Sequence, residues 1–410
     1  MHETKSKRMV GVTFKLKSER RLIMTTGDSD AAIKYAPTPE SLEDFGLVDS
    51  YKDWLKAEGV KVIEDFAFED MSKIELGPWE RKGGKGAVIN IPYHVLTNDS
   101  QIIEIDPGGK SEPEHHVYEE YVYIISGVGA TSIWTGDGSE KKTFEWKKGS
   151  LFSIPLNAWY QHFNGSGAEP ARYLAVTTAP CNMRLFSDND FIFNCDYKFA
   201  NRYSGEDDFF SGNGKLYKRR IWASNFMPNA PDMALYEWSE RGAGGINSMF
   251  EMAGNLSKAH ISEFPIGTYK KAHRHGPGAN LVLLSGDAGF SLIWTKDDMS
   301  DLRKADWKVG SLVIVPSDGT YHQHFNSGTR RARYMALTPG THGLRNPIPR
   351  GQGADASFKA GGYQIEYEDE ERRIHEIFEE ELRKNGVTCR MKAFIPYCTG
   401  EVGPTSAKDA

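Results

Sequence analysis

The sequence contains few cysteines and no long hydrophobic run. Its 410 residues include four cysteines, Cys181, Cys195, Cys389 and Cys398, and none of them belongs to a CxxC pair. Four are too few for a disulfide framework in a chain of this length, so we expect reduced thiols. No stretch approaches the roughly 18 consecutive apolar residues of a membrane helix, and the N-terminus lacks the apolar core of a secretory signal. We therefore expect a cytoplasmic protein with no membrane partner.

Neither sign of charge dominates, and the common cofactor-binding fingerprints are missing. Fifty lysines and arginines against 56 aspartates and glutamates give a formal net charge of −6, which argues against a nucleic-acid partner. A phosphate loop, a Gly-x-Ser-x-Gly elbow and a dinucleotide-binding fingerprint do not occur in strand-turn-helix context. What the chain does contain is turn-forming residues, 41 glycines and 19 prolines, which favour a β-rich protein.

An internal repeat organises the chain. Residues 144–176 recur as residues 305–337, and both copies contain W-K-x-G-S-L, H-F-N and A-R-Y. Further upstream, Gly108 matches Gly267 at nearly the same offset. The apolar runs inside each copy, such as YVYIIS and SLVIVP, are short, rich in β-branched or aromatic residues, and bounded by turns, which is typical of strands in a sandwich or barrel. Each half is thus predicted to hold one copy of the same β domain.

Histidines gather inside the repeat. Seven of the twelve fall within it, at two places in each copy. Residues i and i+2 of a strand point to the same face, so His273 with His275, and His322 with His324, each put two imidazoles on one side. If that side is the barrel interior, a metal site follows. His260, one strand upstream, is expected either to line the same pocket or to be a packed strand residue.

Both copies resemble the cupin superfamily, whose two motifs read roughly G-x5-H-x-H-x3,4-E-x6-G and G-x5-P-x-G-x2-H-x3-N. The resemblance covers about residues 101–180 and 260–340. In the second copy the matching residues are Gly267, His273, His275 and Gly286 for the first motif, and Gly310, Pro316, His322 and Asn326, with one residue inserted, for the second. The glutamate position carries Ala279 or Asn280, so the resemblance implies a metal site of three histidines, His273, His275 and His322.

The resemblance implies an all-β protein of two tandem cupin barrels, that is, double-stranded β-helix or jelly-roll barrels, with a few flanking helices. The expected domains are an N-terminal arm with helices packing on the barrels (1–90), an N-terminal cupin (91–180), a linker (181–245), a C-terminal cupin (246–345) and a C-terminal segment (346–410). In the last of these, Ile374, Ile377, Phe378 and Leu382 share one helical face, and Gly386 follows as a stop, which predicts an amphipathic helix.

The first copy departs further from the motifs. Its second histidine position is His116, but the first is Glu114, and Tyr160 stands where the last histidine is expected. A mixed set of Glu114, His116, Glu120 and His162 is a conceivable second metal site with a poor fit. We expect this cupin to be degenerate or structural.

A three-imidazole set leaves three positions of an octahedral iron open for a chelating substrate and dioxygen. The chain resembles gentisate- and salicylate-type ring-cleaving dioxygenases, which are two-cupin proteins with Fe(II) on three histidines, although their active cupin is usually the N-terminal one. This implies an Fe(II) dioxygenase that cleaves a C–C bond of a small aromatic or organic-acid substrate with O2. His324 and His260 are expected to orient groups or transfer protons, and Arg333 to clamp a carboxylate or form an ion pair.

Two other functions stay open. One is a non-redox metal-dependent lyase, decarboxylase or isomerase with Mn, Ni or Zn as a Lewis acid. The other is a non-catalytic bicupin that binds a small molecule. The missing glutamate ligand favours a resemblance to the three-histidine dioxygenases over one to the oxalate-type manganese enzymes. The latter follow the full pattern of three histidines and one glutamate in both halves. Cupin pairs expose sheet edges, so a homo-oligomer, dimer or tetramer, is expected.

Overall fold

The computed structural model describes residues 49–91, 97–217, 220–317, 319–338 and 353–400. Its contacts divide the chain into a unit of residues 1–49 and a unit of residues 50–410, and every element below belongs to the second unit. The predicted N-terminal arm lies mostly outside the described residues.

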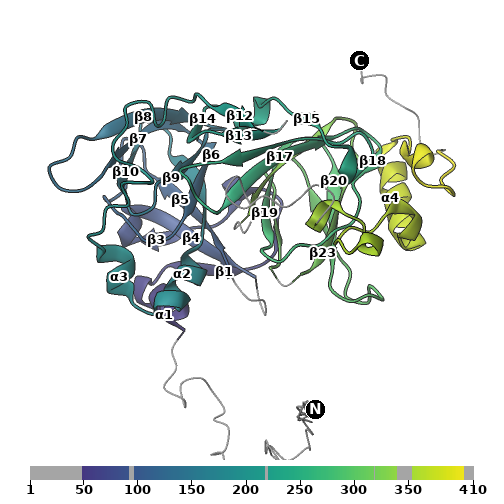
Figure 1. Cartoon of the computed structure of the whole chain (residues 1–410), viewed down its shortest axis with the longest axis horizontal. Coiled ribbons are helices and arrows are strands. Elements are labelled where there is room, and N and C mark those ends of the chain that lie inside the picture. Colours follow the sequence, from purple (N-terminus) through teal and green to yellow (C-terminus); the bar gives the residue numbers. More distant parts are fainter. Residues whose placement is uncertain (1–48, 92–96, 218–219, 318, 339–352, 401–410) are drawn as a thin grey trace, which may run out of the picture. The chain divides into compact units, whose positions relative to one another are not determined.

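The first β-barrel consists of two sheets (Figure 1, blue and teal). The larger has the strand order β1-β4-β5-β11-β6-β9-β14, with β3 beside β4, and the smaller has the order β10-β7-β8. Its strands are β1 (Lys61–Glu64), β3 (Gly77–Trp79), β4 (Gly84–Asn90), β5 (Asp99–Ile105), β6 (Glu120–Ser126), β7 (Val128–Trp134), β8 (Lys142–Lys147), β9 (Leu151–Ile154), β10 (Trp159–Asn164), β11 (Ala171–Thr177) and β14 (Phe226–Met227).

The second barrel repeats this plan (Figure 1, green). Its larger sheet has the order β12-β13-β16-β17-β24-β19-β22-β2, with β15 beside β16, and its smaller sheet the order β18-β23-β20-β21. The strands are β2 (Ala67–Phe68), β12 (Lys215–Tyr217), β13 (Ile221–Ala223), β15 (Tyr236–Glu237), β16 (Ile246–Glu251), β17 (Lys258–Phe264), β18 (Thr268–Tyr269), β19 (Ala279–Ser285), β20 (Gly289–Trp294), β21 (Arg303–Trp307), β22 (Leu312–Val315), β23 (Tyr321–Asn326) and β24 (Ala332–Thr338). The prediction of two tandem cupin barrels is thereby confirmed.

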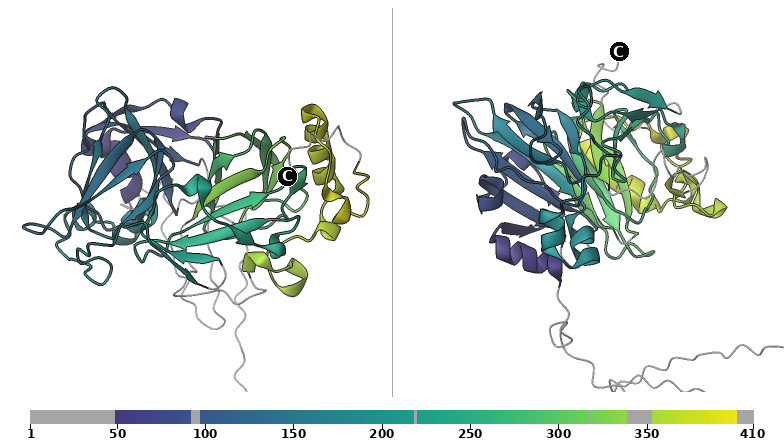
Figure 2. Two further views of the ribbon diagram at one scale, coloured as in Figure 1. Left: turned by 90° about the horizontal axis from the view of Figure 1, so that it is seen from above. Right: turned by 60° about the vertical axis from the view of Figure 1, so that its left-hand side comes forward.

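Helices are few. The α-helices are α1 (Ser50–Glu58), α2 (Ala179–Phe186), α3 (Asn189–Asn194) and α4 (Arg372–Asn385), and the single 3-10 turns are η2 (Met71–Lys73), η3 (Glu80–Lys82), η4 (Ala230–Asp232), η5 (Ser239–Arg241), η6 (Gly353–Asp355), η7 (Phe358–Ala360), η8 (Tyr367–Asp369) and η9 (Met391–Ala393). Helix α4 buries Ile374, Phe378 and Leu382 and ends at Gly386, whose positive φ of 66° suits a residue without a Cβ. The predicted amphipathic helix is thus present, and it packs on the second barrel (Figure 2, yellow).

The first barrel begins earlier than the sequence boundary at residue 91. Strands β1, β3 and β4 fall within residues 61–90, which were expected to be an arm with helices, and β4 pairs with β5 of the barrel. Strands β13, β15 and β16 take the same places in the second barrel, so part of the predicted linker is barrel as well. The sequence does contain a signal for this earlier start of each barrel. The segments WERKGG (79–84) and WSERGAGG (238–245) resemble each other and extend the repeat upstream.

The barrels exchange short strands and share a core. Strand β2 pairs with β22 of the second barrel, and β14 from the linker pairs with β9 of the first. A buried apolar cluster spans both barrels, with Leu151 and Leu174 from one and Leu312 and Met335 from the other. Burial of this surface is therefore what joins the two halves into one unit.

Replacing Leu312 by alanine tests the shared core. Leu312 is fully buried and also pairs with Phe68 of the exchanged strand. We expect Leu312→Ala to lower the free energy of unfolding by about 2–5 kcal/mol, because it removes buried methyl groups and leaves a cavity. Leu256→Ala is the matched control, since Leu256 is 56% exposed. Equal urea midpoints for the two variants would contradict a core shared between the barrels.

Candidate metal centre

Three histidines of the second barrel converge because two chain segments run antiparallel. The segment after β18 carries His273 and His275, and β23 carries His322. Backbone hydrogen bonds join His273 to His322 in both directions, at 3.1 and 2.9 Å. The ring centroids of His273 and His275 lie 4.1 and 4.8 Å from that of His322. One ring nitrogen from each of the three lies within 4.8 Å of the others, so the predicted ligand set comes together.

All three imidazoles are held uncharged by burial, and hydrogen bonds orient two of them as metal ligands, whereas the buried Nδ1 of His275 has no hydrogen-bond partner among the described residues. Burial lowers the pKa of His322 to about 3 and holds the pKa values of His273 and His275 well below their usual range. Nδ1 of His322 faces the Thr320 carbonyl at 3.3 Å, and Nδ1 of His273 faces the Lys271 carbonyl at 3.4 Å. A carbonyl only accepts, so each Nδ1 carries the proton and each Nε2 keeps its lone pair. This donor set fits a divalent transition metal.

No carboxylate completes the set within the described part of this barrel. Ala279 pairs with Val315 in the second barrel, as Glu120 pairs with Ile154 in the first, so alanine occupies the acidic ligand position. The amide of Asn280 points elsewhere, because its oxygen accepts a hydrogen bond of 2.8 Å from Ser100. The ligand group therefore carries no charge of its own.

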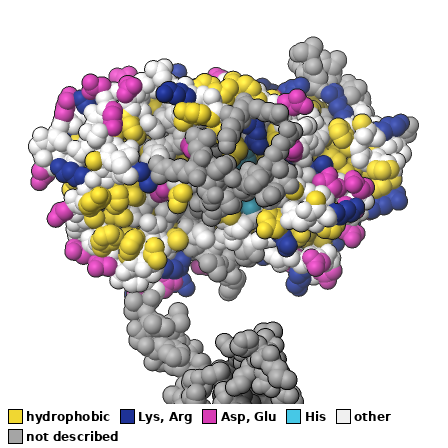
Figure 3. Space-filling model, in the orientation of Figure 1, with side chains coloured by type: hydrophobic (Ala, Val, Ile, Leu, Met, Phe, Trp, Pro, Cys, Tyr) yellow, Lys and Arg dark blue, Asp and Glu magenta, His cyan; other side chains and the backbone are white. Residues whose placement is uncertain are grey.

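His324 and His260 lie near this group but outside it. The ring of His324 lies 5.5 Å from that of His322, and its Nδ1 is 2.9 Å from the hydroxyl of Ser291. His260 on β17 lies 6.0 Å, ring to ring, from Tyr334. Burial, with neighbouring cations as a second cause for His260, holds both pKa values well below the usual range. Both are uncharged imidazoles that can accept or donate a proton. Figure 3 shows histidine side chains visible near the middle of one face.

Two buried cations that the sequence reasoning missed lie beside the histidines. Lys270 is 1% exposed, its Nζ donates to the hydroxyl of Tyr334 at 3.3 Å, and it lies 4.8 Å from the centre of that ring. Burial, then the nearby Arg241 and Arg220, lowers its pKa well below the usual value. Arg241 is 5% exposed and has a carboxylate partner, Asp355, 3.3 Å from its Nε. Among the described residues, no carboxylate contacts the Lys270 ammonium.

Arg333 does not face this group. Its Nε and a terminal nitrogen contact Glu263 at 2.9 and 2.8 Å, and its other terminal nitrogen donates to the carbonyls of Pro231 and Met233. Every donor group of the guanidinium therefore has a partner within the chain. The carboxylate-clamp interpretation of Arg333 is replaced by the ion pair that was its alternative. Arg172 and Glu104 form the same pair in the first barrel.

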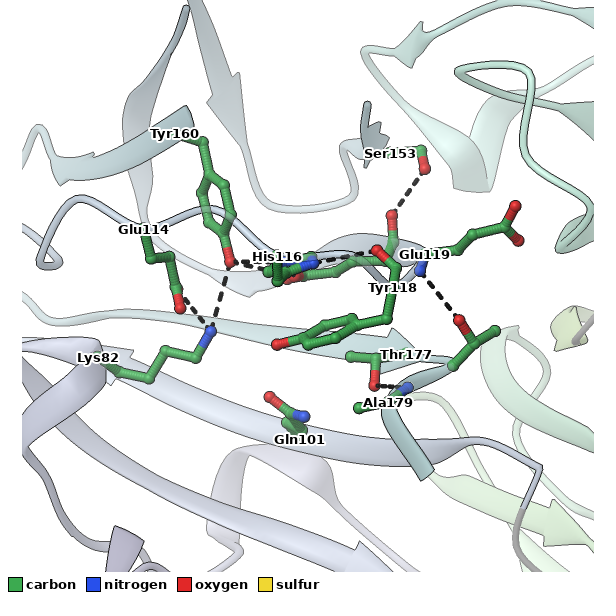
Figure 4. Close-up of polar contacts among 12 residues, drawn as sticks. Lys82, Gln101, Glu114, His116, Tyr118, Glu119, Ser153, Tyr160, Thr177 and Ala179 are labelled. Atoms are coloured by element: carbon green, nitrogen blue, oxygen red, sulfur yellow. Dashed lines mark hydrogen bonds and ion pairs between the residues drawn. The ribbon is translucent and has the colours of Figure 1, made fainter. Parts of the chain in front are cut away.

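A lysine ammonium lies beside two of the ligand positions in the first barrel (Figure 4). Glu114, His116 and Tyr160 stand at the places of His273, His275 and His322. Nζ of Lys82 lies 2.6 Å from Glu114 Oε1 and 3.4 Å from the Tyr160 hydroxyl. His116 Nε2 lies 2.9 Å from Glu120 Oε2.

Charged and hydrogen-bonded partners outweigh the effect of burial on the pKa values of Lys82 and Glu120. Burial acts to lower the pKa of Lys82, but Glu114 and Glu120 outweigh it and the pKa is raised. Burial also acts to raise the pKa of Glu120, but the hydrogen bond with His116 and the charge of Lys82 lower it to about 2.

His162 lies apart from these residues. Its Nδ1 is 2.7 Å from the Thr131 hydroxyl, as the Nδ1 of His324 is close to the Ser291 hydroxyl in the second barrel. In the ranges that the structure describes, the predicted mixed set does not gather as one group of ligand atoms, in keeping with a degenerate first cupin.

The comparisons with known proteins agree with the fold. Residues 101–177 match the Cupin domain family, so the N-terminal half contains a cupin domain. Similar solved structures include the oxalate decarboxylase–formate complex of Lactobacillus farciminis, with 13% identity, 70% of this chain and 87% of that chain covered, and a TM-score of 0.45. Another is the oxalate decarboxylase of Bacillus subtilis, studied for its Mn(II) centres, with 15% identity, coverage of 78% and 88%, and a TM-score of 0.45. At such identity the similarity concerns the fold alone.

No curated protein matches the sequence. Among the helices of the described residues, none has the length and apolar character that crossing a membrane requires.

Replacing Lys82 tests the charge network of the first barrel. Lys82→Met leaves Glu114 and Glu120 without their buried cation, so we expect a loss of about 3–5 kcal/mol of unfolding free energy at neutral pH. Without the lysine, burial raises the pKa of Glu120 toward and above that of the unfolded chain, and protonation then relieves the penalty. The difference from wild type should thus shrink as pH falls toward 4.

Urea titrations at several pH values measure this difference. Lys85→Met is the control, because Lys85 is half exposed and its ion pairs lie at the surface. A deficit that is the same at pH 7 and pH 4 would contradict the role assigned to Lys82.

Proposed function

We propose that the protein is a metal-dependent cupin enzyme that acts on a small organic anion in its C-terminal barrel. His273, His275 and His322 hold one divalent metal ion, and Lys270 and Arg241 favour a substrate of negative charge. The observation that carries the proposal is the meeting of three uncharged imidazoles with a buried ammonium that has no carboxylate partner among the described residues. Fe(II) is the ion expected from the sequence, Ni and Zn also suit imidazole ligands, and Mn, which prefers oxygen ligands, is the further alternative.

The charge balance of the pocket supports a carboxylate substrate. Three neutral ligands leave the charge of a divalent ion uncompensated, and Lys270 adds to it when protonated, whereas Arg241 already has Asp355 as a partner. A buried charge needs a partner, because its transfer from water is costly. A substrate carboxylate supplies that partner, and three histidines leave positions at which it binds. The metal ion, when bound, supplies a Lewis acid that polarises the substrate carboxylate or carbonyl.

Among the possible reactions we favour C–C bond cleavage without net oxidation, as in a decarboxylase or another lyase. Such a reaction requires a proton at the carbon that loses its substituent. Lys270 donates to Tyr334, and burial lowers its pKa, so it releases a proton more readily than an exposed lysine does. His324 and His260 stand nearby as neutral imidazoles that can relay a proton. The pocket thus offers several groups able to hold and deliver one.

The Fe(II) dioxygenase is the second candidate. The observation in its favour is Ala279 at the acidic ligand position, since a three-histidine site has room for a chelating substrate and for O2. A non-catalytic binding bicupin is the third, and it differs from both in showing no turnover.

The metal content of a histidine variant tests the ligand assignment. We expect His273→Ala to lose about one metal equivalent per chain relative to wild type, because two imidazoles hold a divalent ion much more weakly than three. Elemental mass spectrometry on protein purified without oxygen measures it. His115→Ala is the control, since His115 bonds Asn157 away from this group. Unchanged metal content in His273→Ala would overturn the proposed centre.

Turnover with and without oxygen tests the reaction class. Dicarboxylates, 2-oxo acids, salicylate and gentisate are supplied to the metal-loaded protein while CO2 and O2 are measured. We expect CO2 release without stoichiometric O2 uptake, and a KM about 10-fold or more higher in Lys270→Met, because a charge-assisted hydrogen bond is lost. The exposed Lys110 provides the matched control, Lys110→Met. Stoichiometric O2 uptake with ring cleavage would replace the lyase by the dioxygenase, and ligand binding without turnover would favour the binding protein.

A further inference from the structure

Four potential metal ligands meet in the C-terminal segment, away from the histidine group of the second barrel. His375 and Glu379 lie one turn apart on α4, and Cys389 and Cys398 lie in the loop around η9. One ligand atom from each residue falls within 4.8 Å of all the others. His375, Cys389 and Cys398 are at most 4% exposed, so the cluster is closed to solvent on most sides.

We infer that His375, Glu379, Cys389 and Cys398 form a structural zinc site. Two sulfurs, one imidazole nitrogen and one carboxylate oxygen make the four-coordinate donor set that zinc prefers, and a closed set of four protein ligands is typical of structural sites. The spacing explains why the sequence alone did not reveal it, since no CxxC pair is present.

Two of the separations between ligand atoms come within about 0.4 Å of those expected for tetrahedral coordination. Bonds of about 2.3 Å to sulfur and about 2.0 Å to nitrogen or oxygen place tetrahedral ligand atoms roughly 3.3–3.8 Å apart. The two sulfur atoms are 3.4 Å apart, and His375 Nε2 is 3.1 Å from Glu379 Oε1. A disulfide requires about 2.05 Å between the sulfurs, so the thiols are not bonded to each other.

Hydrogen bonds orient His375 as a ligand. The hydroxyl of Tyr269 donates its only proton to Glu370 at 2.6 Å, so it accepts from Nδ1 of His375 at 3.1 Å. Nε2 of a neutral His375 therefore carries a lone pair, and it faces a carboxylate oxygen of Glu379. Either a proton or a metal ion must lie between these two atoms, and the two adjacent sulfurs make this a position for a metal ion. An imidazole whose other nitrogen donates to a fixed acceptor is a common feature of zinc sites.

The site would fix the C-terminal segment to the strand that leads to the histidine group. The Arg390 amide donates to the Gly267 carbonyl at 2.8 Å, and Thr388 lies so close to Gly267 that a side chain there would collide with it. Tyr269, which orients His375, precedes His273 by four residues. Zinc at this place would hold α4 and its loop against β18, and part of the folding free energy would depend on the ion.

Zinc measurements on the full-length protein test the inference. We expect about one zinc per chain that is lost in Cys389→Ser but kept in Cys181→Ser, because Cys181 is exposed and outside the cluster. The same zinc should remain in His273→Ala, which separates this site from the proposed catalytic one. Retention of zinc in Cys389→Ser, or a Cys389–Cys398 disulfide in metal-free native protein purified under argon, would overturn the site.

Cobalt substitution in the wild-type chain gives a result that does not depend on whether a variant folds. Zinc is removed by a chelator under reducing conditions and Co²⁺ is added. We expect a thiolate-to-cobalt charge-transfer band and a rise in the thermal midpoint, since among the described residues only this cluster offers sulfur ligands together with a histidine. A cobalt spectrum without any thiolate band would overturn the site even if Cys389→Ser were unstable.

Discussion

The interior of each barrel excludes water, and every charge placed there must find a compensating partner. The two barrels meet this requirement in opposite ways and with cations at different positions, since the repeat aligns Lys82 with Arg241 and not with Lys270. In the first, the Lys82 ammonium lies against Glu114, and its pKa is raised. In the second, Lys270 lies against the hydroxyl of Tyr334 with arginines nearby, and its pKa falls well below the usual value. The first barrel is balanced within itself, whereas in the second burial disfavours the charged form of Lys270, which has no carboxylate contact among the described residues.

This difference separates the first barrel from the barrel that contains the proposed metal centre. A lysine held by carboxylates has no capacity left for a ligand, and Tyr160 at the place of His322 removes a metal-binding nitrogen as well. In the second barrel the three imidazoles are uncharged, so nothing in the ligand set opposes the nearby cations. The proposal of an anionic substrate thus follows from the electrostatics of the second pocket. In the first pocket the charged groups pair with one another, so among the described residues it offers no unpaired cation to an anion.

The sequence predicted what depends on local spacing and missed what depends on the tertiary fold. Alternation along a strand placed His273 with His275, and the repeat fixed the barrel plan. Lys270 carried no such signal, because its position in the pocket depends on Tyr334, 64 residues later. The sequence left Arg333 between a carboxylate clamp and an ion pair, because its cross-strand partner, Glu263, lies 70 residues earlier, although the repeated Arg172–Glu104 pair hints at that register. Cys389 and Cys398 lay apart in sequence, and only α4 and its loop bring them to His375.

The repeat also explains why equal folds carry unequal chemistry. Each barrel keeps a tryptophan indole that donates to a hydroxyl which contacts the inner histidine: Trp146, Thr131 and His162 in one, and Trp307, Ser291 and His324 in the other. A glycine opposite each indole, Gly129 or Gly289, leaves the space that the ring requires. These contacts shape the barrel wall and survive in both copies. The groups one layer further in, at the ligand positions, differ at almost every place. Function in this chain therefore resides in a few inward-facing substitutions on a common wall, and the wall by itself does not specify the reaction.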